Sequence, residues 1–507
     1  MASGTSPRWP LLCAAVAVLV HWRALSNGFV LDDVRLVENN PAIVTLARLP
    51  RLFVEPYWNI EGEHYGLYRP LTIASFAVDR SVLGPGPRGF HLVNVLLHGS
   101  VAALAWLAFR RAGRHYGTAI LGGLLFAVLP VHTEVVANVA GRAELLAALF
   151  VLAAWLAHRR ASEATARAGW WHIVAAFAYF AAILSKETAV LAPALFFADD
   201  ALREGSRRPA RWAVAAGYAT ALGAMLALRL VALGAHQTAE ATIALDNPAG
   251  AAGPWPRLAT AAWVQLEYAL ACVAPVHLVS DYSFDAVPIA RTFADPRALA
   301  GWTFLAALLL AAAWGWRNSR PVALAALLWA VFFLPSANLV FATGTIMAER
   351  LAYIPSLGFC LAVGHLGAAL VARGGEAAGA RARRIGVGAV AAIVVTACAA
   401  RSFARLADWK DNLTLATTDV ATMPRSAKLQ AGAGMFLAEA GRTAEAEEHL
   451  RRAVEIYPPY AQMHYNLAVL LARRGARAEA IEHLRRAEEL APGNPLPRQL
   501  LGRLTRD

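Results

Sequence analysis

The sequence predicts an all-α membrane protein with about eleven transmembrane helices, followed by a C-terminal α-solenoid. Three observations support this fold class. The 507 residues are 58% hydrophobic and only 16% charged, whereas a soluble protein is typically about 45–50% apolar and about 25% charged. The apolar residues form separate segments of membrane-spanning length. The C-terminal part instead carries a repeat with a period of 34 residues.

Eleven apolar segments are predicted to cross the membrane. Their approximate bounds are 10–26, 91–110, 117–131, 143–158, 171–185, 187–200, 212–234, 299–316, 321–341, 350–371 and 385–400. An alternative interpretation of the first segment is a cleaved signal peptide, but no clear small-x-small cleavage site follows it. A twelfth apolar stretch, 257–279, contains several polar residues and is interrupted by Pro275.

Arginine clusters predict the orientation of these segments. They occur at Arg110, Arg111 and Arg114, at Arg159 and Arg160, at Arg203, Arg207, Arg208 and Arg211, at Arg317 and Arg320, and within 373–384. Positively charged loops remain on the cytoplasmic side, so these loops and residues 1–9 are predicted to face the cytoplasm. The number of crossings between Arg211 and Arg317 must then be even. Segment 257–279 is therefore predicted to lie on the outer face or to re-enter, and the C-terminus to lie outside.

The soluble C-terminal region consists of tetratricopeptide (TPR) repeats. Residues 427–460 align with 461–494, and Gly441, Ala446, Leu450 and Ala453 match Gly475, Ala480, Leu484 and Ala487. A 34-residue period with small residues at the helix crossings and proline at the end is the TPR signature. Half-repeats are expected at about 409–426 and 495–507. Stacked helix pairs present a groove suited to extended peptide, and the alternative role is a platform for assembly.

The predicted organisation is therefore a transmembrane domain, 1–400, with outer loops 27–90 and 235–298, and a TPR domain, 401–507. The net charge of +12 is almost entirely arginine, which together with the high alanine content favours a bacterial origin over a nucleic-acid-binding surface. Cys13, Cys272, Cys360 and Cys398 lie in apolar stretches without a Cys-x-x-Cys pair, so they indicate core packing. No Gly-rich phosphate loop, Ser–His–Asp arrangement or convincing metal cluster is present.

Asp32 and Asp33 follow the first predicted span on the outer side. Consecutive residues do not share a helix face, so one carboxylate can face a substrate while the other orients it or a neighbouring cation. A carboxylate near an apolar boundary has a raised pKa, which suits a general base. The structural alternative is a cap or turn carboxylate at the membrane exit.

Three further outer segments contribute polar candidates. The first, 129–146, includes His132, Glu134, Asn138, Arg142 and Glu144, and a helix would align Glu134, Asn138 and Arg142 in one polar stripe. The others place Lys186 beside Glu187 and Glu349 beside Arg350. Cations near the outer surface oppose the charge bias, and an anionic lipid head group would explain Arg142, Lys186 and Arg350. Pairing with Glu144, Glu187 and Glu349 is the structural alternative, and His132 alone is more typical of a structural histidine.

The outer loop 235–298 contains a last set of candidates. Asp281 and Asp285 are four residues apart, and Tyr282 and Phe284 between them could line a sugar or lipid site, although structural roles are favoured. The preceding amphipathic stretch could lie along the membrane and shape a lipid entrance. The Asp-x-Asp signature of nucleotide-sugar enzymes is absent, which fits a donor without a metal-bound diphosphate.

The chain resembles a known family through motifs that occur in order from about residue 27 to the end. They are NGFVLDDVRLVENNPAI, HLVNVLLHG, LPVHTEVVANVAGRAELLA, LSKETAV, MAERLAYIPSLGF and DWKDNLTL, followed by the TPR repeats. Together they resemble the transmembrane and TPR-containing O-mannosyltransferases, which are GT-C glycosyltransferases that use polyprenyl-phosphate sugars. The resemblance implies that Asp32 and Asp33 correspond to the family's acidic pair. Animal members carry longer repeat arrays, which puts the acceptor in doubt more than the chemistry.

The resulting hypothesis is an inverting glycosyltransferase that moves mannose from polyprenyl phosphate to Ser or Thr hydroxyls of a protein on the outer face. Asp32 or Asp33 is the expected general base, and Arg142, Lys186, Arg350, His132, Glu134 and Glu349 are the expected donor-binding residues. No cofactor or nucleic acid is expected, and a divalent metal is unsupported. Membrane lipid and an acceptor protein held by the TPR groove are the expected partners. The expected location is a bacterial inner membrane with periplasmic TPR repeats, or an ER membrane with luminal ones.

Three other functions remain open. One is a ligase or polymerase that acts on lipid-linked glycans, for which the acceptor is a glycan rather than a protein. Another is a non-catalytic membrane anchor that presents TPR repeats. A transporter is disfavoured, because it would place ionisable residues near the bilayer midplane, whereas the polar candidates here cluster at the outer boundary.

Overall fold

The computed structural model describes residues 8–58, 66–113, 115–163, 167–203, 211–234, 244–373 and 377–506. Arg114, Arg207 and Arg208 of the predicted cytoplasmic clusters lie outside these ranges. Within them the chain is helical and contains no β-strand. The all-α prediction is confirmed.

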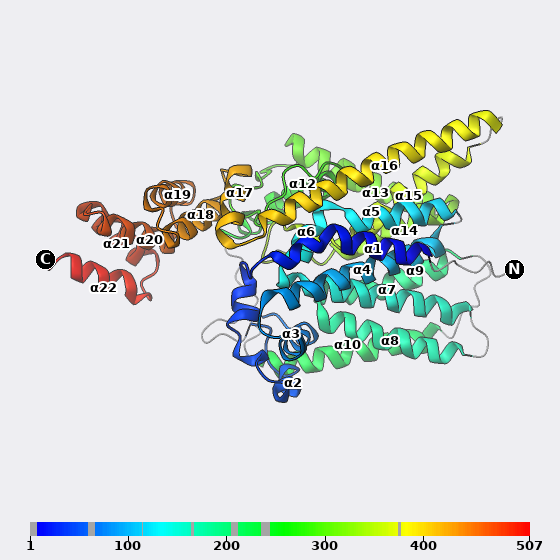
Figure 1. Ribbon diagram of the computed structural model, residues 1–507, viewed down its shortest axis with the longest axis horizontal. Coiled ribbons are helices and arrows are strands. Elements are labelled where there is room, and N and C mark those ends of the chain that lie inside the picture. The colour runs from blue at the N-terminus through cyan, green and yellow to red at the C-terminus, as the bar shows by residue number, and fades with distance from the viewer. Residues whose placement is uncertain are drawn as a thin grey trace.

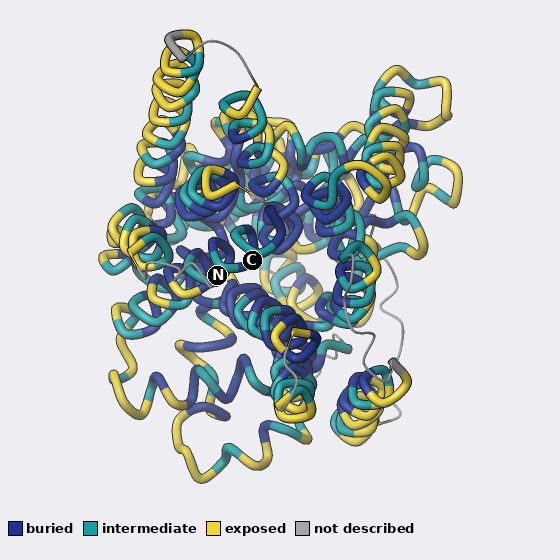
Figure 2. The backbone as a smooth tube through the Cα atoms, turned by 90° about the vertical axis from the view of Figure 1, so that its right-hand side faces the viewer, coloured by how far each residue is buried: buried dark blue, intermediate teal, exposed yellow. Residues whose placement is uncertain are grey.

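The membrane domain is a bundle of helices that run along the long axis of the molecule (Figure 1). Its longer members are α1 (Arg8–His21), α4 (Pro87–Ala112), α5 (Tyr116–Val128), α7 (Arg142–Glu163), α8 (Ala168–Ser185), α10 (Arg211–Leu233), α13 (Pro296–Asn318) and α16 (Ala377–Asp408). Shorter members are α9 (Ala192–Ala201), α14 (Arg320–Phe333) and α15 (Ser356–Ala372). Viewed end-on, buried residues occupy the centre of the bundle and exposed residues its periphery (Figure 2).

Seven helices of the described residues are long and apolar enough to cross a membrane, or eight if α5 and the bent segment after it form one span. The predicted number of eleven is not confirmed, because α9, α14 and α15 contain only 10, 14 and 17 residues. At 1.5 Å per residue such helices are shorter than a bilayer core of about 30 Å. Large apolar side chains on the outside of the bundle, including Phe177, Leu310 and Ile393, are exposed. The chain is a multi-pass membrane protein.

The arginine-rich connections meet at one end of the bundle. Arg320 and Arg159 both contact Asp199, at 2.6 and 3.5 Å, and Arg203 contacts Asp200 at 2.5 Å. Arg111 lies 3.4 Å from Glu163. These contacts join four of the five predicted cytoplasmic clusters. The four clusters therefore lie on one side of the bundle, as the positive-inside rule predicts.

The segment predicted not to cross the membrane forms α12 (Pro254–Val273). Just before it, Asn247 donates a hydrogen bond to the Thr343 carbonyl at 2.7 Å, and just after it the Val279 amide donates to Glu349 at 2.7 Å. Thr343 and Glu349 both belong to the connection between α14 and α15. The two ends of α12 therefore lie on the same side of the bundle, which agrees with an even number of crossings.

Glycines allow α5 and α15 to approach closely in the bundle centre. A Cβ atom at Gly364 would lie 2.3 Å from the Thr118 carbonyl oxygen, and one at Gly122 would lie 2.8 Å from that of Cys360. Small residues at helix interfaces permit this packing in membranes, where apolar burial against lipid gives little driving force. These contacts fix the middle of α15 against α5.

The C-terminal region stacks antiparallel helix pairs away from the bundle (Figure 1). Its helices are α17 (Asn412–Thr422), α18 (Ala427–Glu439), α19 (Thr443–Ile456), α20 (Ala461–Arg473), α21 (Arg477–Leu490) and α22 (Pro495–Leu504). Gly441 and Gly475 occupy the turns with φ of 77° and 85°, a conformation that favours glycine. The predicted repeats are confirmed. Residue 401 lies within α16, which runs on to Asp408.

Candidate functional site

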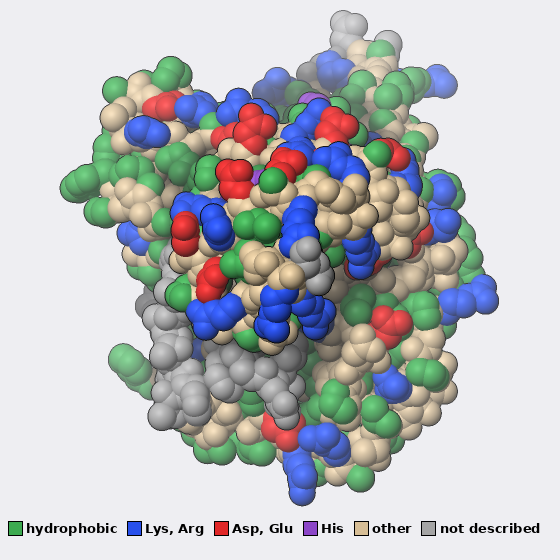
Figure 3. All heavy atoms as spheres, turned by 90° about the vertical axis from the view of Figure 1, so that its left-hand side faces the viewer, with side chains coloured by type: hydrophobic (Ala, Val, Ile, Leu, Met, Phe, Trp, Pro, Cys, Tyr) green, Lys and Arg blue, Asp and Glu red, His purple; other side chains and the backbone are tan. Residues whose placement is uncertain are grey.

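A cavity of about 550 Å³ opens at the end of the bundle that carries the TPR repeats. Its wall combines apolar residues, among them Tyr57, Trp58 and Phe341, with a set of charged side chains. The charged residues are Asp32, Arg69, Glu134, Glu144, Lys186, Glu187 and Arg350. Seen from this end, charged side chains of both signs are interspersed over the surface (Figure 3).

The two adjacent aspartates have different environments. Asp32 is exposed and lines the cavity, whereas Asp33 is completely buried. Asp33 accepts hydrogen bonds from the backbone amides of Ala140 and Val139 at 2.8 and 3.0 Å, and from Val30 at 3.4 Å. Asp33 therefore joins the loop after α1 to the turn before α7, and this junction presents Asp32 to the cavity.

A strained turn precedes the aspartates. Leu31 has a φ of 50°, a region that non-glycine residues rarely adopt. Its amide donates a hydrogen bond to the side-chain oxygen of Asn412 at 2.9 Å, and Gly28 donates to the Lys410 carbonyl at 2.8 Å. Contacts from the start of the TPR region thus hold this turn in place.

The turn before α7 is built by a break in the helix. The segment forms α6 (Thr133–Ala137) and then a 3₁₀ turn, Val139–Gly141, capped by Asn138, whose side chain accepts from the Ala140 amide at 2.9 Å. A Cβ atom at Gly141 would lie 2.4 Å from the Val135 carbonyl, so only glycine fits this close approach. The predicted single stripe of Glu134, Asn138 and Arg142 is wrong because of this break.

Three cation–carboxylate pairs line the cavity. Arg69 binds Glu187 through Nε and Nη2 at 2.9 and 2.5 Å. Arg350 donates to Glu134 from Nη1 at 2.6 Å and from its backbone amide at 2.8 Å. Lys186 pairs with Glu144. Lys186 and Arg350 are thus paired with carboxylates, as in the structural alternative, but the partners come from other segments: Arg350 binds Glu134 rather than Glu349, and Lys186 binds Glu144.

Arg350 is the most accessible cation of the three. Its side chain is 38% exposed, against 15% for Arg69 and 5% for Lys186. Burial lowers the pKa of Arg350, but the negative charges of Glu134 and Asp32 outweigh it and raise the pKa. Asp32 and Arg350 therefore interact electrostatically across one cavity, and Arg350 keeps its charge there.

Asp33 also has a perturbed pKa. Burial raises it to about 7, although hydrogen bonds from Ala140, Val139 and Val30 lower it. Its buried position and its three amide donors suit an orienting group, and the exposed Asp32 suits proton exchange with a bound molecule. This geometry divides the acidic pair into one exposed and one orienting carboxylate.

Besides the buried Asp33, three sequence-predicted site residues do not reach the cavity. Arg142 is fully buried and pairs with Asp79, while its Nε donates to Asn94 at 2.8 Å. His132 is buried between the Phe126 carbonyl and Ser356. Glu349 is buried and accepts from the Val279 amide and the Tyr282 hydroxyl at 2.7 and 2.9 Å. None of the three therefore lines this cavity, because the helix break turns Arg142 into the core and the 3₁₀ turn at 349–352 buries Glu349.

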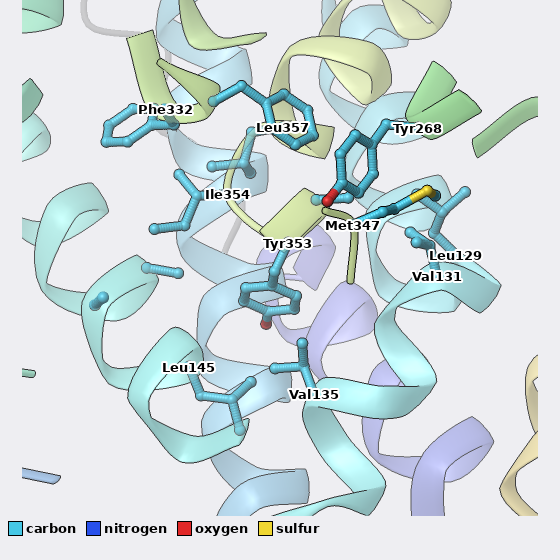
Figure 4. Packing of buried hydrophobic residues seen from close by; sticks show 14 of the residues in the cluster. Leu129, Val131, Val135, Leu145, Tyr268, Phe332, Met347, Tyr353, Ile354 and Leu357 are labelled. Carbon is cyan, nitrogen blue, oxygen red and sulfur yellow. The ribbon is translucent and has the colours of Figure 1, made fainter. Parts of the chain in front are cut away.

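A hydrophobic cluster supports this part of the site from behind. Tyr353 and Ile354 belong to it, together with Val135 of α6, Leu145 of α7 and Phe332 of α14 (Figure 4). The Tyr268 hydroxyl accepts a hydrogen bond from the Ala348 amide at 3.0 Å. These contacts fix the segment that carries Arg350 and leave its guanidinium free to reach the cavity.

Arg69 is a cavity residue that sequence reasoning did not identify. Its guanidinium also lies over the Tyr57 ring, 5.1 Å from the centroid. It is an arginine on the predicted outer side, so the argument that selected Lys186 and Arg350 could have found it. Asp79, the partner of Arg142, had no comparable signal in the sequence.

The remaining candidates in the outer loop, Asp281, Tyr282, Phe284 and Asp285, form structural contacts. Asp281 binds Lys428 at 3.1 Å, and Phe284 packs against Tyr457. Among the residues that the structure describes, no group of three or more His, Cys, Asp or Glu side chains is placed to hold a metal ion.

Two family models match parts of the chain, and individual relatives align with most of it. Residues 237–309 match the family described as Protein O-mannosyl-transferase TMTC, DUF1736, and residues 399–461 and 434–495 match a tetratricopeptide repeat family. A protein O-mannosyl-transferase of Caenorhabditis elegans is 28% identical over 89% of this chain and 63% of its own length. The protein O-mannosyl-transferase TMTC3 of Homo sapiens is 26% identical over 90% of this chain and 52% of its own length.

This chain thus spans about half to two thirds of the length of these relatives. A solved oligosaccharyltransferase of Archaeoglobus fulgidus, tethered to an acceptor peptide, aligns with a TM-score of 0.45 at 13% identity. That alignment covers 78% of this chain and 55% of the other.

Proposed function

We propose that this chain, a TMTC-type relative of the protein O-mannosyl-transferases with TPR repeats, is a membrane glycosyltransferase that transfers mannose. The proposed donor is a polyprenyl-phosphate sugar, and the proposed acceptor is a Ser or Thr hydroxyl of a protein. The cavity lined by Asp32 and Arg350 is the observation that carries the proposal, because it combines an exposed carboxylate with an exposed guanidinium. The reaction needs both a base and a stabiliser of anionic phosphate.

The lining of the cavity suits both the lipid and the phosphate of the proposed donor. Apolar side chains such as Trp58, Phe341 and Leu351 share its wall with the charged groups, which suits the lipid end of the donor next to its phosphate. Guanidinium groups bind phosphate with directed hydrogen bonds. Arg350 uses Nη1 for Glu134 and keeps further N–H donors for the donor phosphate.

In the proposed mechanism, the acceptor hydroxyl oxygen attacks C1 of the sugar and transfers its proton to the Asp32 carboxylate. The new bond joins C1 to the acceptor oxygen, and the bond between C1 and the phosphate oxygen breaks on the opposite face. The bonding electrons remain on the lipid phosphate, where Arg350 stabilises the charge. Such a displacement inverts the anomeric centre. Asp33 does not react, but its three amide contacts hold Asp32 in position.

No resident cofactor takes part in this proposal, because the lipid-linked sugar is itself the substrate. The TPR groove would hold the acceptor chain close to the cavity, since the repeats stand at the same end of the bundle (Figure 1). We place this end on the non-cytoplasmic side, in the periplasm for a bacterial protein or in the lumen for an ER protein. That orientation follows from the arginine-rich connections at the opposite end.

The test is transfer of radiolabelled mannose from synthetic polyprenyl-phosphate mannose to protein in detergent. Asp32→Asn is expected to lower transfer by about 10²–10⁴-fold, the range for loss of a general base, without a change in thermal stability. Glu38→Gln is the matched control, since Glu38 is exposed in the same segment and is absent from the cavity wall.

The outcomes separate the competing functions. Transfer that survives Asp32→Asn would contradict the assigned base. Release of lipid phosphate without labelled protein would identify a different acceptor and favour a glycan ligase or polymerase. Intact protein that neither transfers nor hydrolyses any polyprenyl-phosphate sugar would favour a TPR scaffold.

A further inference from the structure

A second cavity, of about 560 Å³, lies at the opposite end of the bundle from the candidate active site. It is formed where the ends of α4 and α9 meet the junction of α13 and α14 and the side of α15. Arg203, Arg317, Ser319, Arg320 and His365 are among its polar lining residues. The proposed transferase reaction does not use any of them.

The charged groups of this cavity leave an excess of positive charge. Arg320 donates to Asp199 at 2.6 Å, and Arg203 donates to Asp200 at 2.5 Å and to Glu163 at 3.4 Å. Asp199 also accepts from the Trp155 indole at 2.9 Å, so its carboxylate is already shared. Arg317 is exposed, and within the described part of the chain it forms no ion pair or side-chain hydrogen bond. An anion in the cavity would meet a cation that is not yet neutralised.

Polar atoms of the wall also lack partners. Nδ1 of His365 and Nε of Arg203 are buried without a hydrogen bond, while Nε2 of His365 contacts the Ser319 hydroxyl at 3.3 Å. A buried polar atom without a partner is unfavourable. A bound molecule with several acceptor oxygens would satisfy both atoms, and a phosphate group offers such oxygens next to the arginines.

The cavity lies at the level expected for lipid head groups. Trp316 belongs to its wall, and Trp314, Trp212 and Trp170 at the same end of the bundle are 57%, 88% and 62% exposed. Tryptophan concentrates at the boundary between the hydrocarbon core and the head groups. Basic pockets between membrane helices on the cytoplasmic side suit anionic lipid head groups.

We propose that this cavity binds the phosphate of an anionic phospholipid head group, with Arg317 and Arg203 as direct ligands. The lipid would join the ends of α9, α13 and α15. Two of these helices, α9 and α15, are too short to span the bilayer alone. A head group bound in this cavity would fill the space at their cytoplasmic ends. This inference does not depend on the proposed transferase activity.

The test uses the full-length protein in neutral detergent and measures its thermal unfolding during titration with phosphatidylglycerol or phosphatidylcholine. Phosphatidylglycerol is expected to raise the Tm in a saturable way, and phosphatidylcholine is not. Arg317→Gln is expected to weaken the apparent affinity about tenfold, the effect of losing one charged hydrogen bond. The variant should fold normally, because Arg317 is exposed and unpaired.

Arg167→Gln is the matched control, because Arg167 is an exposed arginine at the same end of the bundle but outside the cavity. It is expected to retain the full response to phosphatidylglycerol. Equal stabilisation by inorganic phosphate at the same concentration would identify a free anion as the ligand and overturn the lipid assignment. Equal weakening in both variants, or no preference for the anionic lipid, would overturn the site itself.

Discussion

Arg142 and Arg350 carry the same guanidinium group in opposite environments. Arg142 is fully buried, pairs with Asp79, and donates further bonds to Asn94 and the Phe90 carbonyl at 2.8 Å each. Arg350 has one carboxylate partner and a side chain that is 38% exposed to the cavity. The first arrangement uses the charge to hold α3 (Pro70–Leu83) and α4 against α7. The second leaves the charge available to a ligand.

Substitution of these two arginines should therefore give different kinetic and stability effects. Arg350→Gln is expected to raise the KM for the lipid-linked donor about tenfold, because one charged hydrogen bond is lost. It should lower the Tm less than Arg142→Gln does, because Glu134 keeps its hydrogen bond from the backbone amide of residue 350. Arg142→Gln is expected to destabilise the protein by about 3–5 kcal/mol, because Asp79 is left buried and unpaired. Thermal unfolding and transfer kinetics on both variants provide the measurement. A normal Tm for Arg142→Gln would contradict the structural role.

Asp33 should give the protein a characteristic dependence of stability on pH. Burial raises its pKa to about 7 in the folded state, above the ordinary value of about 3.9 for an unfolded chain. The folded protein therefore binds the proton more tightly, and this stabilisation is complete below pH of about 4 and is lost as the pH rises towards 7. Asp33→Asn should remove this component. The measurement is the difference in Tm between wild type and variant from pH 4 to 8, and a constant difference would contradict the assignment.

At the scale of elements, hydrophobic periodicity predicts helices well, but it does not show where a helix breaks. The run 129–146 joins two predicted spans, and the spacing of Glu134, Asn138 and Arg142 would align them in one stripe if the run were helical. The Asn138 cap and the close contact at Gly141 divide it. That break turns Arg142 into the core while Glu134 remains at the cavity. Partners distant in sequence, such as Asp79 and Asn94, are supplied by packing and leave no local pattern.

A charged clamp connects the first TPR helix to the outer loop. Lys428 of α18 binds Asp246 at 2.7 Å and Asp281 at 3.1 Å. These two carboxylates outweigh the burial of Lys428 and raise the pKa of its ammonium group. The neighbouring Asn247 donates to the carbonyl of Thr343, which lines the cavity of the candidate site. A continuous set of contacts thus links the TPR region to the wall of the site.

Removal of the clamp should loosen both ends of this connection. Lys428→Met leaves Asp246 and Asp281 close together without a cation, so faster amide hydrogen exchange is expected in 244–247 and 338–345. The expected kinetic effect is a higher KM for the acceptor protein. Arg425→Gln is the control, because the Arg425–Asp285 pair is exposed and such pairs contribute about 0–1 kcal/mol. Unchanged exchange in Lys428→Met would show that the TPR region and the cavity are independent.

At the scale of the whole molecule, the two ends of the bundle differ in chemistry. One end gathers the arginine-rich connections, whose contacts converge on Asp199 and Asp200. The other carries the candidate active site, α12 and the TPR repeats (Figure 1). The charge bias of the loops anticipates this division, because it reflects membrane insertion rather than packing. The lengths of the individual helices depend on packing. The prediction of eleven full spans therefore missed that α9, α14 and α15 are short.

This polarity can be tested by single-cysteine labelling in sealed vesicles of known orientation. Cysteine at Glu38 or Arg485, both exposed at the TPR-bearing end, should react with a membrane-impermeant maleimide from one side. Cysteine at Arg167 or Asn318, exposed at the other end, should react only from the opposite side. The four native cysteines are buried and should give little background, and a permeant maleimide should label all four variants.

The positive-inside rule predicts that Arg167 and Asn318 face the cytoplasm. Glu38 and Arg485 would then share the compartment of the acceptor protein, as a TPR groove that delivers an acceptor to Asp32 requires. If the cysteine at position 485 is labelled from the same side as the cysteine at position 167, the repeats lie across the membrane from the cavity. The TPR region could not then present an acceptor to this site, and any transferase activity would need another route for its substrate.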